Sequence, residues 1–119
     1  MKKNIEGLIS PLITPFTNSG EFDEVKFREE LRTVLKAGVH GVSPGGSTGE
    51  GAALTDEELV RCINIIREED TEALIISGVI RNSTRSAIET ALAAKKAGTD
   101  GIMVTPVSYN VLVPDDEGN

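Results

Sequence analysis

The stretch AGVHGV at residues 37–42 returns, little changed, as AGTDGI at residues 97–102, an offset of 60 residues. Because one βα unit takes roughly 30 residues, this offset corresponds to two such units. In both copies a glycine, Gly38 or Gly98, follows a helical pattern, and a left-handed glycine commonly ends a helix. An apolar run then begins at once, as in a strand that enters a sheet. The repeat therefore predicts alternating helices and strands.

Three stretches have the apolar periodicity of amphipathic helices. They run from about residue 23 to 37, from 56 to about 68, and from about 84 to 97. The second stretch begins with a capping box, and the third has Ser83 as its candidate N-cap. We expect all three helices to face a common core. The inner positions predicted for the third helix are Ala87, Ile88, Ala91, Leu92 and Ala94.

Four short apolar runs form the predicted strands, at residues 7–13, 39–43, 73–79 and 101–105. They are nearly continuous and do not alternate, which is typical of parallel strands buried on both faces. The resulting order is βαβαβαβ, and crossovers between parallel strands are right-handed. Periodicity leaves two architectures open, a closed barrel and a doubly wound open sheet.

Composition excludes several classes of protein. The 119 residues suit one compact domain, with 26% charged and 39% hydrophobic residues. The net charge of −7 and the absence of long basic runs argue against nucleic acid as a partner. No apolar run is long enough to span a membrane, so we expect no membrane partner. The single cysteine, Cys62, fits a reducing compartment, which predicts a cytoplasmic protein.

The loop after the second predicted strand is the strongest candidate for a binding site. Ligands bind beyond the carboxyl ends of the strands in either architecture. Residues 44–51 read PGGSTGEG, with four glycines around two adjacent hydroxyls, Ser47 and Thr48. Free amides and hydroxyls can bind a carboxylate or phosphate without any cation. A merely flexible turn is the competing interpretation, and the fingerprints of nucleotide-binding loops are absent.

Four motifs stand at the carboxyl ends of successive predicted strands. They are Thr14-Pro15-Phe16, Gly46-Ser47-Thr48-Gly49-Glu50, Asn82-Ser83-Thr84, and Thr105-Pro106 followed by Tyr109-Asn110. On these motifs the chain resembles the dihydrodipicolinate synthase / N-acetylneuraminate lyase family of class I pyruvate-dependent aldolases, over nearly its whole length. The resemblance implies an α/β fold, the N-terminal half of a (β/α)₈ or TIM barrel, with strands 1–4 and helices 1–3 in residues 1–119.

The resemblance also implies a chemistry, in which pyruvate or another α-keto acid forms a Schiff base with a lysine. Ser47, Thr48 and Tyr109 then occupy catalytic positions in a proton relay. Gly46, Ser47 and Thr48 bind the substrate, with the loop amides on its carboxylate. Tyr109 matches a tyrosine that family members extend into the partner's site, so a homo-oligomer is implied. Neither a metal nor a cofactor is implied.

Two departures from the family pattern limit these expectations. Ser108 stands where many relatives carry a tyrosine, which leaves the acceptor aldehyde or sugar acid open. In the family the Schiff-base lysine lies on strand six, whereas the lysines here are at the N-terminus or on predicted helices. We therefore expect a dihydrodipicolinate synthase-like lyase truncated before strand 5 and inactive alone. N-acetylneuraminate lyase or 2-keto-3-deoxy sugar acid aldolase activity is one alternative, and a non-catalytic half-barrel that binds a small carboxylate is another.

Several polar residues are given structural roles. Cys62 is expected in the core, and Glu50 is expected to tie down backbone amides of its own turn. His40 has no second metal-ligating partner nearby, so a zinc site is not predicted. The acidic run at residues 68–70 is expected to be a solvated surface. The unpaired edges of a half-barrel predict self-association.

Overall fold

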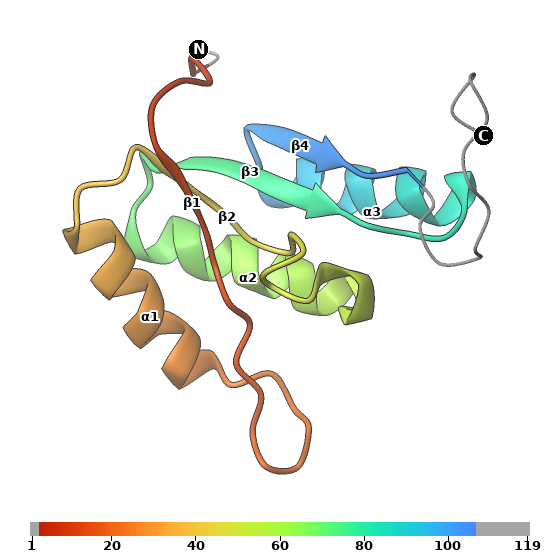
Figure 1. Ribbon diagram of the computed structural model, residues 1–119, viewed down its shortest axis with the longest axis horizontal. Coiled ribbons are helices and arrows are strands. Elements are labelled where there is room, and N and C mark those ends of the chain that lie inside the picture. Colours follow the sequence, from red (N-terminus) through yellow and green to blue (C-terminus); the bar gives the residue numbers. More distant parts are fainter. Residues whose placement is uncertain (1–2, 107–119) are drawn as a thin grey trace.

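The computed structural model of the chain describes residues 3–106, which contain one parallel sheet. Its strands are β1 (Ile9–Pro11), β2 (Gly41–Ser43), β3 (Leu74–Val79) and β4 (Gly101–Val104). They lie side by side in this order, and each strand is parallel to the next (Figure 1). Strand order therefore follows chain order without a reversal.

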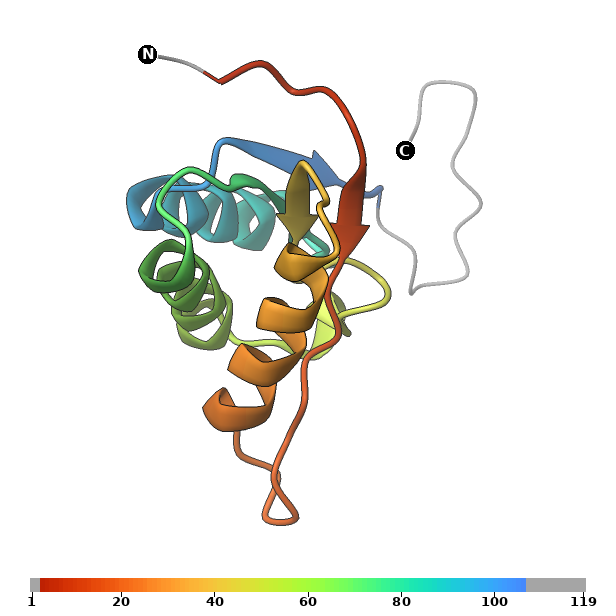
Figure 2. The ribbon, with the colours of Figure 1, turned by 90° about the vertical axis from the view of Figure 1, so that its left-hand side faces the viewer.

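A helix connects each strand to the next. The helices are α1 (Glu24–Lys36), α2 (Asp56–Glu69) and α3 (Thr84–Ala97). All three cover the same face of the sheet, and α2 contacts both of the others (Figure 2). A doubly wound sheet reverses its strand order and carries helices on both faces, so that alternative is excluded. The fold is the N-terminal half of a (β/α)₈ barrel, as predicted.

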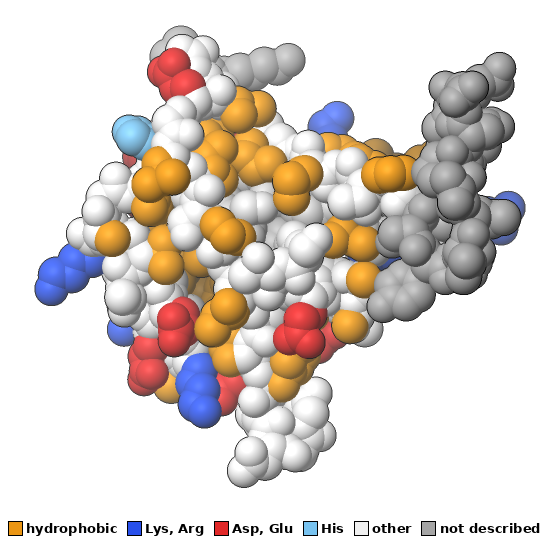
Figure 3. All heavy atoms as spheres, viewed as in Figure 1, with side chains coloured by type: hydrophobic (Ala, Val, Ile, Leu, Met, Phe, Trp, Pro, Cys, Tyr) orange, Lys and Arg blue, Asp and Glu red, His pale blue; other side chains and the backbone are white. Residues whose placement is uncertain are grey.

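The other face of the sheet carries no helix in the part of the chain that the structure describes. Hydrophobic side chains gather over the strands on this side (Figure 3). Ile13 and Met103 are each 47% exposed. In a closed barrel this face is the packed interior. None of the helices within residues 3–106 has the length and apolar character needed to cross a membrane.

The helix ends confirm the signals read from the sequence. Thr55 Oγ1 accepts a hydrogen bond from Glu58 N (3.1 Å), and Glu58 Oε1 accepts one from Thr55 N (2.9 Å). Ser83 Oγ accepts a bond from the first turn of α3. Gly38 and Gly98 both adopt left-handed backbone, with φ of 90° and 106°. The AGVHGV and AGTDGI repeats therefore play the same part, closing a helix before β2 and before β4.

The strands are shorter than predicted. β1 has 3 residues, although a strand over residues 7–13 was predicted. Gly7 has φ of 91°, which interrupts extended backbone before the strand. Beyond Pro11 the contact with β2 continues through one hydrogen bond, from Leu12 N to Ser43 O (3.0 Å). β2 likewise begins at Gly41 and not at residue 39, and β4 ends at Val104.

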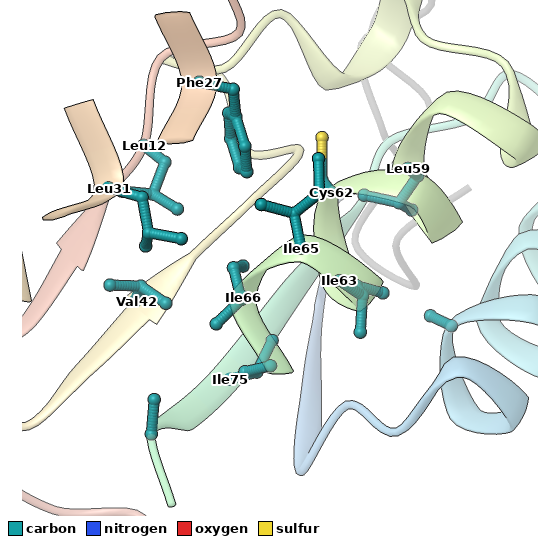
Figure 4. Packing of buried hydrophobic residues seen from close by; sticks show 12 residues of the cluster. Leu12, Phe27, Leu31, Val42, Leu59, Cys62, Ile63, Ile65, Ile66 and Ile75 are labelled. Carbon is teal, nitrogen blue, oxygen red and sulfur yellow. The ribbon is translucent and has the colours of Figure 1, made fainter. Parts of the chain in front are cut away.

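The main core lies between the helices and the sheet, and Figure 4 shows how its side chains meet. Its buried residues are Leu12, Phe27, Leu31, Val42, Leu59, Cys62, Ile63, Ile65, Ile66, Ala73, Ile75 and Ala94. Cys62 is fully buried here, which confirms its predicted role as a core residue. Burial raises the pKa of its thiol to about 12, so the thiol stays protonated and unreactive.

Helix α3 corrects the prediction that all three helices bury their apolar stripes in one core. Ile88 is 54% exposed and Leu92 is 60% exposed. The residues that α3 buries are Thr90 and Ala94. The prediction is therefore confirmed for Ala94 and wrong for Ile88 and Leu92, and Ile88 lines an open groove together with Ile102 and Val104 of β4. Val104 on β4 is also exposed, at 56%.

The acidic run at the end of α2 was predicted to be solvated, and this is wrong for Glu69. Its side chain is 16% exposed and receives hydrogen bonds from Arg28 Nη1 (3.0 Å) and Arg32 Nε (2.8 Å) of α1. These guanidinium groups, Arg32 first and Arg28 second, lower the pKa of Glu69 to about 2. Glu68 pairs with Arg28 and Arg61. Ion pairs therefore join α1 to α2 along their exposed side.

Candidate functional site

The loop after β2 folds back across the carboxyl ends of β2 and β3. Pro44 O accepts a hydrogen bond from Gly78 N of β3 (2.8 Å), which anchors the start of the loop. Gly46 O then accepts one from Gly51 N (2.9 Å), which closes the loop on itself. A short 3₁₀ turn, η1 (Gly51–Ala53), follows and leads into α2. Backbone hydrogen bonds thus join the loop to β3 and close it on itself.

Two glycines allow the backbones to pack this tightly. A Cβ atom on Gly51 would lie 1.7 Å from Gly45 O, and one on Gly78 would lie 2.1 Å from the same oxygen. Contacts this short cannot be relieved without moving the main chain. Any side chain at either position would therefore displace the loop.

The two predicted hydroxyl residues lie at the outer bend of this loop. Ser47 and Thr48 are exposed, whereas Gly46 and Gly49 on either side are buried. Within residues 3–106 the amides of Ser47 and Thr48 donate no hydrogen bond to another backbone group. Two hydroxyls and two backbone N–H groups are therefore available to a ligand at the carboxyl end of β2. A carboxylate fits this set of donors.

The motifs that follow β1, β3 and β4 surround the loop, and two of them have structural roles. Thr14, after β1, is buried and donates a hydrogen bond from Oγ1 to Gly49 O (2.6 Å). Ser83, after β3, caps α3. Thr105, after β4, has a buried Oγ1 with no hydrogen-bond partner in the described region. Tyr109, the third predicted catalytic residue, lies outside the described residues, so its position relative to Ser47 and Thr48 stays a prediction.

Arg81 is the site residue that sequence reasoning missed. It follows β3, its side chain is 13% exposed, and its guanidinium donates to five acceptors. Two of them are carbonyl oxygens of the turn below the loop, Gly51 O (2.8 Å) and Leu54 O (2.9 Å). The sequence signal that could have identified Arg81 is its place as a charged residue two positions after the end of a buried strand.

Arg81 also replaces Glu50 in the role predicted for that residue. The Glu50 side chain is exposed and makes no capping hydrogen bond to η1. The backbone of Glu50 is left-handed, with φ of 56°, and its amide donates to Ser47 O (3.1 Å). The main chain of Glu50 thus closes the turn, and the side chain that ties the turn down is Arg81.

A polar network connects Arg81 to both flanking helices. Its guanidinium donates to Asp56 Oδ1 (3.0 Å) at the start of α2 and to Thr90 Oγ1 (2.9 Å) of α3. Thr90 in turn donates to Asp56 Oδ1 (2.6 Å). The hydrogen bond from Thr90, together with Arg81, holds the pKa of the Asp56 carboxyl below its ordinary value. A charged network, in which the Arg81 guanidinium donates to five acceptors, therefore holds the loop between α2 and α3.

The lysines of residues 3–106 lie away from the loop. Lys26 and Lys36 are on α1, and Lys95 and Lys96 are on α3. Lys3 Nζ donates to Ala73 O (2.9 Å), which directly precedes β3 and so lies at the opposite end of the sheet. Within this range no lysine follows the carboxyl end of a strand, so the described residues supply no amine beside Ser47 and Thr48.

A sheet of sequential parallel strands, with one face covered by helices and polar loops at its carboxyl edge, defines the class: a (β/α)₈-barrel protein, represented by its N-terminal half. The family model described as "Dihydrodipicolinate synthetase family" matches residues 4–115. The chain belongs to this family.

Individual relatives agree with this assignment. 4-Hydroxy-tetrahydrodipicolinate synthase of Methanopyrus kandleri is 41% identical over 116 residues, which cover 96% of this chain and 38% of that protein. The structure of 4-hydroxy-tetrahydrodipicolinate synthase from Methylacidiphilum fumariolicum SolV has a TM-score of 0.83 and 31% identity, covering 97% of this chain and 38% of that one. The structure of YagE, a prophage protein from E. coli K12 solved in complex with pyruvate, has a TM-score of 0.81 and 30% identity. The match covers 92% of this chain and 37% of YagE. The chain thus spans less than two fifths of the length of these relatives.

Proposed function

We propose that this chain carries the α-keto-acid-binding half of a pyruvate-dependent lyase or aldolase of the dihydrodipicolinate synthase type. One observation carries the proposal: Ser47 and Thr48 present free hydroxyls and amides at the carboxyl end of β2, on a loop that Arg81 and Thr14 hold in place. A rigid set of donors stabilises a carboxylate without having to reorganise when it binds. Membership of the family supports pyruvate as that carboxylate.

In the proposed reaction, a lysine amine attacks the keto carbon of pyruvate, and water leaves to give a protonated imine. Loss of a methyl proton converts the imine to an enamine, which then attacks an aldehyde carbonyl and forms the carbon–carbon bond. The amides of the loop from Gly46 to Thr48 hold the carboxylate throughout. The hydroxyls of Ser47 and Thr48, with Tyr109, move protons between these steps. The lysine itself is supplied from outside this chain.

Two other functions stay in competition with this one. Ser108 in place of a tyrosine favours a different acceptor, as in an N-acetylneuraminate lyase or a 2-keto-3-deoxy sugar acid aldolase. A non-catalytic half-barrel that binds a small carboxylate is favoured by the positions of Lys3, Lys26, Lys36, Lys95 and Lys96, none of which follows a strand in the described region.

We place the protein in the cytoplasm, because its single cysteine, Cys62, suits a reducing compartment. We further propose that it acts as a homo-oligomer, in which Tyr109 reaches the site of a neighbouring copy. The exposed apolar side chains along α3 and β4 support an assembled form.

The proposal is tested by trapping the imine with borohydride in the presence of pyruvate and measuring intact mass. The chain alone is expected to gain no pyruvyl group. A mixture with the rest of the barrel, taken from the M. kandleri synthase beyond its matched region, is expected to gain one on that fragment. The double variant Ser47→Ala, Thr48→Val should lower the yield in the same mixture.

Two results would contradict the proposal. Stoichiometric modification of the chain alone would mean that one of its own lysines forms the imine. Equal trapping with the double variant and with the unmodified chain would mean that the Ser47-Thr48 loop does not hold the substrate.

A further inference from the structure

Ser43 is a buried hydroxyl that no group of the described chain satisfies. It is the last residue of β2, it is only 7% exposed, and its Oγ has no hydrogen-bond partner within residues 3–106. Most buried side-chain polar atoms in proteins are paired, so an orphan hydroxyl calls for a specific explanation. The other buried strand serine, Ser77, differs because its Oγ donates to Gly78 O (3.4 Å).

The Ser43 side chain lies on the face of the sheet opposite the helices. Successive side chains of a strand alternate between faces, and the preceding residue, Val42, belongs to the core beneath the helices. Ser43 is therefore on the barrel-interior face, where its neighbour on β1 is Pro11. Pro11 has no side-chain donor or acceptor to offer, so the sheet itself gives the hydroxyl no partner.

The hydroxyl is also directly adjacent to the candidate binding loop. The position that a Cβ atom would take on Gly46 is 3.9 Å from Ser43 Oγ and 3.6 Å from Met103 Cε. The space beside Gly46 is thus bordered by the orphan hydroxyl on one side and by an apolar side chain from β4 on another. A ligand whose carboxylate is held by the amides of Ser47 and Thr48 would extend into this space.

We propose that the Ser43 hydroxyl donates a hydrogen bond to the keto oxygen of the bound α-keto acid. This inference rests on the proposed function, because it takes the loop as the carboxylate site. The keto oxygen is on the carbon next to the carboxylate, so it is the first polar atom that a ligand places beyond the loop. Ser43 is then a specificity residue that distinguishes an α-keto acid from a simple carboxylic acid of the same length.

The test compares two probe acids, pyruvate and propionate, which differ by the keto oxygen. Binding to the full chain is followed through the amide NMR signals of Gly46 and Gly49. Ser43→Ala is expected to weaken pyruvate binding about five- to tenfold, as for the loss of one hydrogen bond, and to leave propionate binding unchanged. Ser77→Ala is the matched control, because it removes a buried strand hydroxyl that is already paired.

A second readout separates this role from a structural one. Removing an unpaired hydroxyl should leave the denaturation midpoint of Ser43→Ala unchanged or raised, while Ser77→Ala should lower it. Equal pyruvate affinity in Ser43→Ala and the unmodified chain would overturn the inference and leave the proposed function standing. An equal loss for both acids would also overturn it, since the hydroxyl would not then distinguish the keto group. No response of the loop to either acid in the unmodified chain would overturn the proposed function, and the inference with it.

Discussion

Helices α2 and α3 are equal in length, at 14 residues each, yet they use their apolar faces in opposite ways. α2 lies between its neighbours and buries five residues, Leu59, Cys62, Ile63, Ile65 and Ile66. α3 follows it in the series, buries Thr90 and Ala94, and leaves Ile88 and Leu92 more than half exposed. An apolar stripe in a sequence therefore shows that a neighbour is needed, and not that one is present.

The largest effect expected from this comparison is on stability. Ile66→Ala on α2 should destabilise the chain by about 2–5 kcal/mol, because it removes a fully buried side chain and leaves a cavity. Leu92→Ala on α3 should change the free energy of unfolding by less than about 0.5 kcal/mol. Urea denaturation of both variants measures the difference. Similar losses at the two positions would mean that the stripe of α3 is buried in solution.

The next effect concerns the polar network that holds α3 to α2. Arg81→Met should cost about 1–3 kcal/mol, because it leaves the carbonyls of Gly51 and Leu54 and the Asp56 carboxylate without this donor. Arg85→Met, at an exposed position on α3, is the control. Urea midpoints give the cost, and hydrogen exchange should show faster exchange of the Gly51 amide in Arg81→Met alone. Equal midpoints in the two variants would show that the network contributes nothing.

A smaller effect is expected on self-association. Contiguous exposed apolar side chains favour contact between copies. Leu92 and Ile102 line one open groove, and Ile102 lines a second with Ile88 and Val104, so these four exposed side chains form one such surface. Leu92→Glu should weaken association about tenfold, equivalent to about 1.4 kcal/mol. Val25→Glu, on α1 at 69% exposure, should leave it unchanged. Sedimentation over a range of concentrations measures both, and a monomeric unmodified chain would refute the prediction.

The smallest effect is the pH dependence at the joint between α1 and α2. The pKa of Glu69 falls from 4.5 to about 2 on folding, so its contribution is complete above pH 4.5. It should be lost as the pH falls from 4.5 towards about 2, where Glu69 becomes protonated in the folded chain as well. As the pH is lowered across this range, the urea midpoint of Glu69→Gln should fall less steeply than that of the unmodified chain. Parallel curves for the two proteins would show that Glu69 titrates normally.

Local signals predicted most of the fold. The capping box of Thr55 and Glu58, the N-cap Ser83 and the left-handed Gly38 and Gly98 act within a few residues of themselves, so the sequence displays them directly. The alternation of helices and strands followed from the repeat, whereas the order of the strands within the sheet followed only from the family resemblance, which implied a half-barrel. The burial of Ile88 and Leu92 on α3 was predicted wrongly, because burial depends on which elements lie beside the helix.

The candidate site was predicted less completely. The position of Ser47 and Thr48 at the carboxyl end of β2 follows from the order of strand and loop. Arg81 was missed because its acceptors come from η1, α2 and α3, which only the tertiary structure brings together. Ser43 was missed because a strand serine has no distinguishing pattern until the absence of a partner is visible.

The central claim is that the loop from Gly46 to Gly49 binds the carboxylate of an α-keto acid. Titration of the ¹⁵N-labelled chain with pyruvate tests it most directly. The account predicts saturable shifts of the Ser47 and Thr48 amides. The amides of Gly20 and Gly38, which donate to Thr17 O (2.9 Å) and Leu35 O (3.1 Å) away from the loop, should not shift. Shifts confined to other parts of the chain, or none at all, would contradict it.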